Sequence, residues 1–273
     1  MGRGIVRTAL RHGFGVALFD VNADAVRRVV QAAALDAETA GSALVVASSV
    51  ASALDRADVV IEAVVESESA KAAVLSEVAR ATGPDTLLAT NTSTFSIARL
   101  AAAGGCAGRL VGMHFFNPVE KMRLVEVVAA DGVPDRYIQR ATRLAQALGK
   151  TPVVVRDSPG FITSRLGLLL GTEAMRLVSS GVAAPESVDV AMRLGYNHPM
   201  GPLELADLVG LDARLNNLNA LYPALDDERY RPPQILVDLV SAGHLGRKSG
   251  RGFYLYDADG RKLGPAPRTE GSL

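Results

Sequence analysis

Hydrophobic and polar residues follow two alternating periods along the first half of the chain. Runs of consecutive apolar residues, typical of strands buried on both faces, alternate with stretches whose apolar residues recur at helical spacing. The runs that predict strands are residues 15–20, 45–47, 58–65, 86–90, 109–115, 124–128 and 151–156. The stretches that predict helices are residues 4–12, 69–81 and 135–148, one capped by Asn22, a short one before Asp58 and one from Ser96. This alternation predicts an α/β domain with a mostly parallel sheet covered on both faces.

From Asp157 onward the pattern changes to helical periodicity alone. Helices are predicted over residues 160–180, 185–194, 202–221 and 233–242, and no convincing strand precedes Gly252. We therefore predict a nucleotide-binding domain at residues 1–156, an all-helical domain at residues 157–262 and a tail at residues 263–273.

Composition excludes several classes of function. The chain has 29 Lys and Arg against 29 Asp and Glu, so nothing suggests a bulk affinity for nucleic acid or a membrane surface. The longest apolar runs are too short to span a bilayer, and no signal sequence opens the chain. The single Cys106 excludes an internal disulfide and fits a reducing compartment. We expect a cytoplasmic protein without a metal site.

The N-terminal residues carry part of a dinucleotide-binding pattern. Gly2 and Gly4 open a helix, and Asp20 ends the next predicted strand. In a Rossmann-like fold, glycines precede the helix that holds the pyrophosphate, and an acidic residue after the second strand binds the ribose hydroxyls. Taken singly, the glycines fit a close packing contact and Asp20 fits a turn. Together with the strand–helix rhythm they favour NAD, because Asp20 would repel the 2′-phosphate of NADP.

Several motifs in the middle and end of the chain resemble one enzyme family. They are NTSTFSI from Asn91, HFFNPVEKMRLVEVV from His114 and GRKSGRGFY from Gly246, supported by DSPGF from Asp157 and HPMGPLELADLVGLD from His198. In this order they resemble the L-3-hydroxyacyl-CoA dehydrogenases, of the 3-hydroxybutyryl-CoA type. The resemblance implies a Rossmann-like domain followed by a helical domain, and NAD-dependent interconversion of (S)-3-hydroxyacyl-CoA and 3-ketoacyl-CoA. It also implies a homodimer formed through the helical domain.

The resemblance assigns the catalytic residues. His114 ends an apolar strand, where open α/β sheets bind ligands, and a histidine suits removal of a hydroxyl proton near neutral pH. Without the motif, a histidine there would more often be structural. Glu126 matches the carboxylate that orients the imidazole and stabilises its charged form. Ser93 matches the residue that contacts the substrate hydroxyl, although alone it would read equally as a cap or turn serine. Ser164 stands where the family usually has an asparagine that positions the substrate.

Further residues match cofactor contacts of the family. Asn91 lies at a strand end where the nicotinamide is expected, and Glu66, Lys71 and Lys248 match residues that contact the cofactor. Each of these charged residues would, on its own, be an ordinary surface charge. Their assignment therefore rests on the resemblance.

Two further departures from the family affect the prediction. No residues precede Met1 to form the first strand and its glycine turn, so we expect Met1 to be an internal methionine of a longer reading frame. Residues 31–44, which replace a polar hairpin that grips CoA, contain no lysine or arginine. Two alternatives therefore stay open at this point. One is a relative without catalysis, and the other is a dehydrogenase of a free 3-hydroxy acid.

Overall fold

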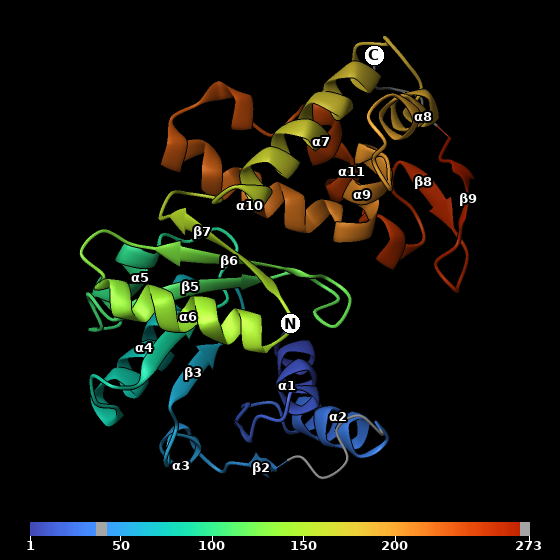
Figure 1. Ribbon diagram of the computed structural model, residues 1–273. Helices are drawn as coiled ribbons and strands as arrows, with labels where there is room; N and C mark the ends of the chain where they lie inside the picture. Colours follow the sequence, from blue (N-terminus) through green and yellow to red (C-terminus); the bar gives the residue numbers. More distant parts are fainter. Residues whose placement is uncertain (37–42, 268–273) are drawn as a thin grey trace. The chain divides into compact units, whose positions relative to one another are not determined.

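The computed structural model describes residues 1–36 and 43–267 (Figure 1). The chain divides into two compact units, Met1–Phe161 and Ile162–Leu273, which we call unit 1 and unit 2. The sequence predicts a domain boundary between residues 156 and 157, a few residues before the division between Phe161 and Ile162 in the structure. Residues 37–42 of the predicted CoA hairpin lie outside the described residues.

Unit 1 alternates strands and helices in the predicted order. Its elements are α1 (Gly2–Arg11), β1 (Val16–Leu18), α2 (Ala23–Ala34), β2 (Leu44–Val46), α3 (Val50–Ala53), β3 (Val59–Glu62), α4 (Glu68–Ala81), β4 (Leu87–Thr90), α5 (Ile97–Ala103), β5 (Leu110–Phe115), β6 (Leu124–Ala129), α6 (Asp135–Ala147) and β7 (Thr151–Arg156). Asn22 caps α2 as expected, because its side-chain oxygen accepts from the backbone N–H groups of Asp24 and Ala25.

The strands of unit 1 form two separate sheets. One contains five strands in the order β3-β4-β5-β6-β7, and the other pairs β1 with β2. β6 runs antiparallel to β5, whereas every other pair of neighbours is parallel. Within the described residues, no strand joins β1 to β3. The prediction of a mostly parallel, Rossmann-like sheet is confirmed, with the sheet divided between β1 and β3.

Helices cover both faces of the five-stranded sheet (Figure 1). On one face, Ile5 of α1 and Tyr137 of α6 pack with Val111 of β5. On the other face, Leu75 of α4 and Leu100 of α5 belong to a second core cluster. Every residue of β4 and β5 is consequently buried. Burial on both faces explains why these strands appear in the sequence as continuous apolar runs.

Helix α1 also packs against the smaller sheet. Its Val6 and Leu10 form a small core with Val29 of α2, and half-buried Val16 and Leu18 of β1 pack against this core. Because Ile5 belongs to the core of the larger sheet, α1 contributes side chains to the cores of both sheets. The N-terminus of this helix is therefore held by packing on both sheets.

Unit 2 is mainly helical. Its elements are α7 (Thr163–Ser179), α8 (Pro185–Gly195), α9 (Pro202–Val209), α10 (Leu211–Leu225), η2 (Glu228–Tyr230), α11 (Gln234–Ser241), η3 (Arg247–Ser249), β8 (Tyr254–Tyr256) and β9 (Lys262–Pro265). The single helix predicted over residues 202–221 is wrong, because Gly210 adopts φ 105° and separates α9 from α10. The tail predicted from residue 263 is wrong for residues 263–265, which pair in β9 with β8.

A buried carboxylate connects α9 to the C-terminal strands. Asp207 accepts hydrogen bonds from the backbone N–H groups of Phe253 and Tyr254, at 3.0 and 2.9 Å, and from the hydroxyl of Tyr256. A side chain at Gly252 would collide with this carboxylate. Burial raises the pKa of Asp207 to about 6. Part of the GRKSGRGFY motif thus has a structural role.

Candidate active site

His114 and Glu126 form a buried pair in the five-stranded sheet. The antiparallel register of β5 and β6 places the two residues directly opposite each other. His114 Nδ1 lies 2.7 Å from Glu126 Oε2, and the residues are 7% and 1% exposed. Among the described residues, the other ring nitrogen of His114, Nε2, has no hydrogen-bond partner. A carboxylate at Nδ1 leaves Nε2 to accept a proton.

The loop after β4 is attached to the end of β5. Asn91 Oδ1 accepts a hydrogen bond of 2.9 Å from the backbone N–H of Phe115, the residue that follows His114. The backbone N–H of Asn91 donates to the carbonyl of Glu62 in β3. Asn91 therefore joins three neighbouring strands at the edge where β3, β4 and β5 end. Its predicted place beside the nicotinamide stays a prediction.

Glu66 holds the residues that follow Asn91. Its Oε1 accepts from Thr92 Oγ1 at 2.6 Å, from Ser93 N at 2.9 Å and from Ser93 Oγ at 3.3 Å. Partial burial opposes ionisation of Glu66, but these hydrogen bonds and the charge of Lys71 outweigh it and lower its pKa. The structure thus brings two predicted site residues, Ser93 and Glu66, into direct contact.

Lys71 is buried in a cluster of charges. The residue is 0% exposed, and its Nζ donates to both carboxylate oxygens of Glu62, at 3.0 and 3.2 Å. The same ammonium lies 3.3 Å from Glu66 Oε2 and 3.5 Å from the carbonyl of Val64. Glu62 also accepts from Thr90 Oγ1 at 2.6 Å. In this arrangement Lys71 stabilises Glu66, which in turn holds Ser93.

The N-terminus of α1 and the end of β1 carry the predicted dinucleotide contacts. The first turn of a helix presents backbone N–H groups that the helix does not use, and α1 begins at Gly2. A Cβ atom at Gly4 would lie 2.8 Å from Val119, so this position requires glycine. Asp20 is exposed beyond β1, and its Oδ1 accepts from Asn22 N at 2.8 Å. A helix N-terminus with unused N–H groups and an exposed carboxylate are the two features that a dinucleotide-binding site requires.

The remaining predicted residues belong to unit 2. Ser164 lies in the first turn of α7. Lys248, in η3, donates 2.6 Å hydrogen bonds to both carboxylate oxygens of Asp212. Despite some desolvation, the hydrogen bonds and charge of Lys248 lower the pKa of Asp212.

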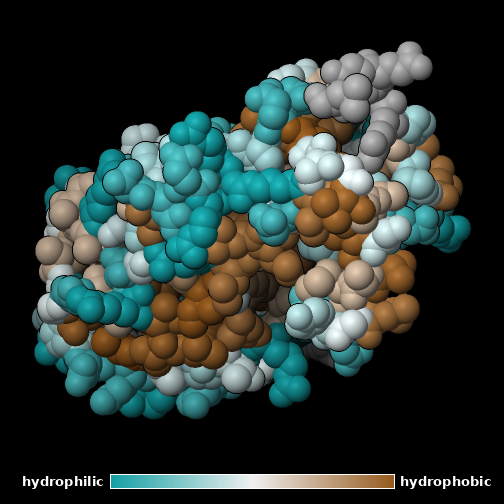
Figure 2. All heavy atoms as spheres, turned by 90° about the horizontal axis from the view of Figure 1, so that it is seen from above, coloured by the Kyte–Doolittle hydropathy of each residue, from teal (hydrophilic) through white to brown (hydrophobic). Residues whose placement is uncertain are grey.

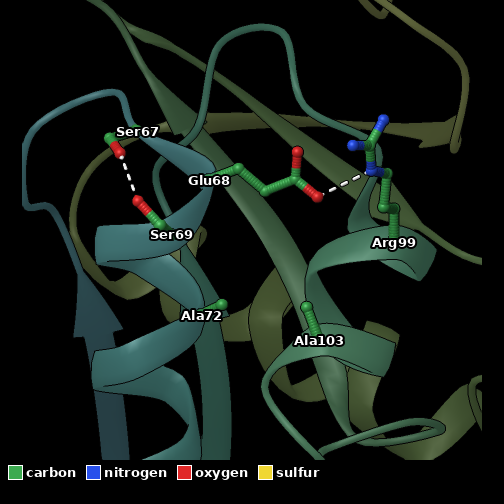
Figure 3. Close-up of a pocket in the computed structure, with 6 residues that line it drawn as sticks. All are labelled: Ser67, Glu68, Ser69, Ala72, Arg99 and Ala103. Atoms are coloured by element: carbon green, nitrogen blue, oxygen red, sulfur yellow. Dashed lines mark hydrogen bonds and ion pairs between the residues drawn. The ribbon is translucent and has the colours of Figure 1, made fainter.

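A separate pocket of about 510 Å³ opens beside the start of α4 (Figure 3). It is lined by Ser67, Glu68, Ser69, Ala72, Arg99 and Ala103. Figure 3 shows Glu68 and Arg99 facing each other, with 2.6 Å between Glu68 Oε1 and Arg99 Nε. None of the predicted site residues lines this pocket.

Family comparisons cover both units. The model for the NAD binding domain of 3-hydroxyacyl-CoA dehydrogenase matches residues 1–158. The model for the C-terminal domain of 3-hydroxyacyl-CoA dehydrogenase matches residues 160–256. The chain belongs to the 3-hydroxyacyl-CoA dehydrogenase family. Like the family's NAD binding domain, unit 1 is a binding domain for NAD.

Curated relatives and solved structures of the 3-hydroxyacyl-CoA dehydrogenases agree with this assignment. The probable 3-hydroxybutyryl-CoA dehydrogenase of Bacillus subtilis is 42% identical over 94% of both chains. The 3-hydroxybutyryl-CoA dehydrogenase of Bradyrhizobium diazoefficiens is 40% identical over 94% of this chain and 92% of its own. The structure of (S)-3-hydroxybutyryl-CoA dehydrogenase PaaH1 from Ralstonia eutropha has a TM-score of 0.89 at 38% identity, covering 94% of this chain and 95% of that one.

The structure also reveals residues that the sequence analysis of this dehydrogenase missed. Glu62 could have been noticed, because a carboxylate inside an otherwise apolar strand needs a buried partner. Within residues 1–36 and 43–267, no group of three or more His, Cys, Asp or Glu side chains could hold a metal ion. In the same residues, no helix has the length and apolar character to cross a membrane.

Proposed function

We propose that this protein interconverts (S)-3-hydroxybutyryl-CoA and acetoacetyl-CoA, using NAD. The buried His114–Glu126 pair is the observation that carries the proposal. It supplies an imidazole whose Nδ1 is hydrogen-bonded to a carboxylate and whose Nε2 has no hydrogen-bond partner among the described residues. The choice of substrate is supported by the 3-hydroxybutyryl-CoA dehydrogenase of Bradyrhizobium diazoefficiens and the probable 3-hydroxybutyryl-CoA dehydrogenase of Bacillus subtilis.

In the oxidation direction, His114 Nε2 removes the proton of the substrate's 3-hydroxyl group. Glu126 stabilises the positive charge that the imidazole then carries and keeps its Nδ1 protonated. When bound, NAD would supply the acceptor for the hydride that leaves the carbon bearing this hydroxyl group. Ser93 hydrogen-bonds the reacting oxygen, and Glu66 keeps the Ser93 backbone in place through its N–H group. Ser164 contributes a shorter hydrogen-bonding group than asparagine for positioning the substrate.

The first turn of α1 at Gly2 would hold the pyrophosphate of the cofactor, and Asp20 would hold its adenosine ribose. Asn91 would contact the nicotinamide, because it follows β4 at the edge of the sheet where β5, the strand that carries His114, also ends. Glu66 and Lys71 stabilise this edge of the sheet through contacts inside the protein, since Lys71 is fully buried. Lys248 is proposed as a cofactor contact on the basis of the family resemblance alone.

The test compares acetoacetyl-CoA with free acetoacetate, following NADH oxidation. We expect kcat/KM for the CoA ester to exceed that for the free acid by at least about 10², because binding energy from remote parts of a substrate lowers the barrier. NADPH in place of NADH should support little turnover. Equal rates with the free acid would instead favour a dehydrogenase of free 3-hydroxy acids.

We also propose a cytoplasmic homodimer formed through unit 2. Several large apolar side chains of this unit are exposed, including Leu166 at 62%, Leu194 at 82% and Tyr196 at 76%. Figure 2 shows hydrophobic side chains gathered in groups on the surface that it draws. Exposed apolar groups of this kind mark contact surfaces. Light scattering after gel filtration should give the mass of two chains, and a monomer at micromolar concentration would contradict the proposal.

A further inference from the structure

Two aromatic rings contact the imidazole of His114. The ring centroid of Phe116 lies 4.5 Å from that of His114, with 49° between the planes. The centroid of Phe161 lies 5.8 Å away, with 56° between the planes. Both distances are within the range in which aromatic rings attract each other. Phe116 is two residues from His114 in the chain, whereas Phe161 comes from the segment after β7.

The backbone of Phe161 adopts a conformation that side chains disfavour. Its φ is +49°, directly after Gly160 at +74°, and its N–H donates to the carbonyl of Ser158 at 2.9 Å. Glycine or asparagine would occupy this left-handed region more easily than phenylalanine. Phe161 is nevertheless 3% exposed and packs in the core cluster between the sheet and α5. Strain of this kind in a non-glycine residue is frequent at functional sites.

The turn that carries Phe161 is tied to the loop that carries Ser93. Asp157 Oδ2 accepts a hydrogen bond of 2.8 Å from Ser96 Oγ and one of 2.9 Å from Ala98 N. Asp157 itself is attached to β6, because its N–H donates to the carbonyl of Ala129. The start of α5 and the 157–161 turn are therefore held together by one carboxylate.

We propose that Phe161 is a positioning residue that fixes the orientation of the His114 imidazole. This inference rests on the proposed function, in which His114 is the base. The hydrogen bond to Glu126 holds one ring atom, Nδ1, but leaves the ring able to tilt about that point. Phe116 lies only two residues from His114, in the same segment of the chain. Phe161 limits the tilt from a different segment, and so keeps Nε2 aimed at the substrate hydroxyl.

The test replaces the ring while keeping an apolar side chain. Phe161→Leu should lower kcat by about tenfold, because a small misplacement of a catalytic group has large effects on rate. The KM values for NADH and acetoacetyl-CoA should stay within about twofold, since the ring binds neither directly. Phe161→Tyr, which keeps the ring, should restore kcat. If Phe161→Leu does not fold, Phe161→Met takes its place in the test, because the flexible methionine side chain fills an altered core more easily.

Phe115→Leu is the matched control. Phe115 is 2% exposed and lies next to His114, but strand alternation directs its side chain to the opposite face of the sheet, into the core with Val125 and Val127. It should lose stability to a similar extent as Phe161→Leu and keep kcat within about threefold of wild type. Thermal unfolding of both variants checks the match.

Proton NMR of the ligand-free protein gives a readout that does not depend on turnover. The Nδ1–H of His114, bonded to a carboxylate, should give a downfield signal in wild type and in Phe115→Leu. That signal should broaden or vanish in Phe161→Leu. If Phe161→Leu and Phe115→Leu give the same kcat and the same signal, the positioning role is overturned. Near-normal turnover of His114→Gln would instead overturn the proposed function.

Discussion

Two buried groups of charged residues in unit 1 use their hydrogen bonds in different ways. Lys71 directs its ammonium to Glu62, Glu66 and a backbone carbonyl, all within the protein. His114 is bonded through Nδ1 to Glu126, and its Nε2 has no partner among the described residues. A group whose polar atoms are all engaged holds the structure in place. A group that keeps one atom for the substrate is able to perform chemistry.

The largest expected effect is on turnover. His114→Gln should lower kcat by about 10² to 10⁴, the usual effect of losing a general base, while the Kd for NADH stays nearly unchanged. Stopped-flow turnover and NADH fluorescence titration measure the two quantities. Near-normal turnover would show that His114 is not the catalytic base. The distinction between a catalytic His114 and a structural Lys71 would then be wrong.

Removing Lys71 should affect stability instead. In Lys71→Met, the carboxylates of Glu62 and Glu66 lose the ammonium between them, and a broken buried ion pair typically costs about 3–5 kcal/mol. Urea unfolding should show this loss in the free energy of unfolding. Combining Lys71→Met with Glu62→Gln removes one of the uncompensated charges and should recover part of it. An unfolding free energy within about 1 kcal/mol of wild type would show that the cluster is not what holds this region.

A smaller effect is expected from Glu66, on how the stability of the protein changes at acid pH. Its pKa is lowered in the folded state, so the ionised carboxylate stabilises the fold above the ordinary value of 4.5. This contribution disappears as the pH falls through the lowered folded-state pKa. As the pH falls below about 5, wild type should therefore lose more stability than Glu66→Gln. Parallel stability curves for the two proteins would contradict this account of Glu66.

Most elements of the fold could be predicted from the sequence, because the spacing of their apolar residues matches the helix or strand that they form. β4 and β5 are buried on both faces and therefore are continuous apolar runs. The break at Gly210 was missed, because an isolated glycine within a helical pattern does not reveal its φ. The division of the sheet between β1 and β3 depends on strand pairing, which local patterns do not contain.

The site was predicted in part. The motifs named His114 and Glu126, but only the register of β5 and β6 explains why the two residues meet. Lys71 was interpreted as a cofactor contact, whereas the structure shows it fully buried between carboxylates. Its partner Glu62 is noticeable in the sequence as a carboxylate inside an apolar strand, but the ion pair with Lys71 depends on how α4 packs against β3. Phe161 was missed since contacts between distant segments leave no local pattern.

The most direct test of the account is a double-mutant cycle on His114 and Glu126. Turnover of acetoacetyl-CoA with NADH is measured for His114→Gln, Glu126→Gln and the double variant. Glu126→Gln keeps the shape of the side chain but removes the charge that stabilises the imidazolium, so it should lower kcat by about 10². Because the pair acts as one unit, the double variant should be only slightly slower than His114→Gln alone. Losses that multiply fully would show that the two residues work independently and would contradict the account.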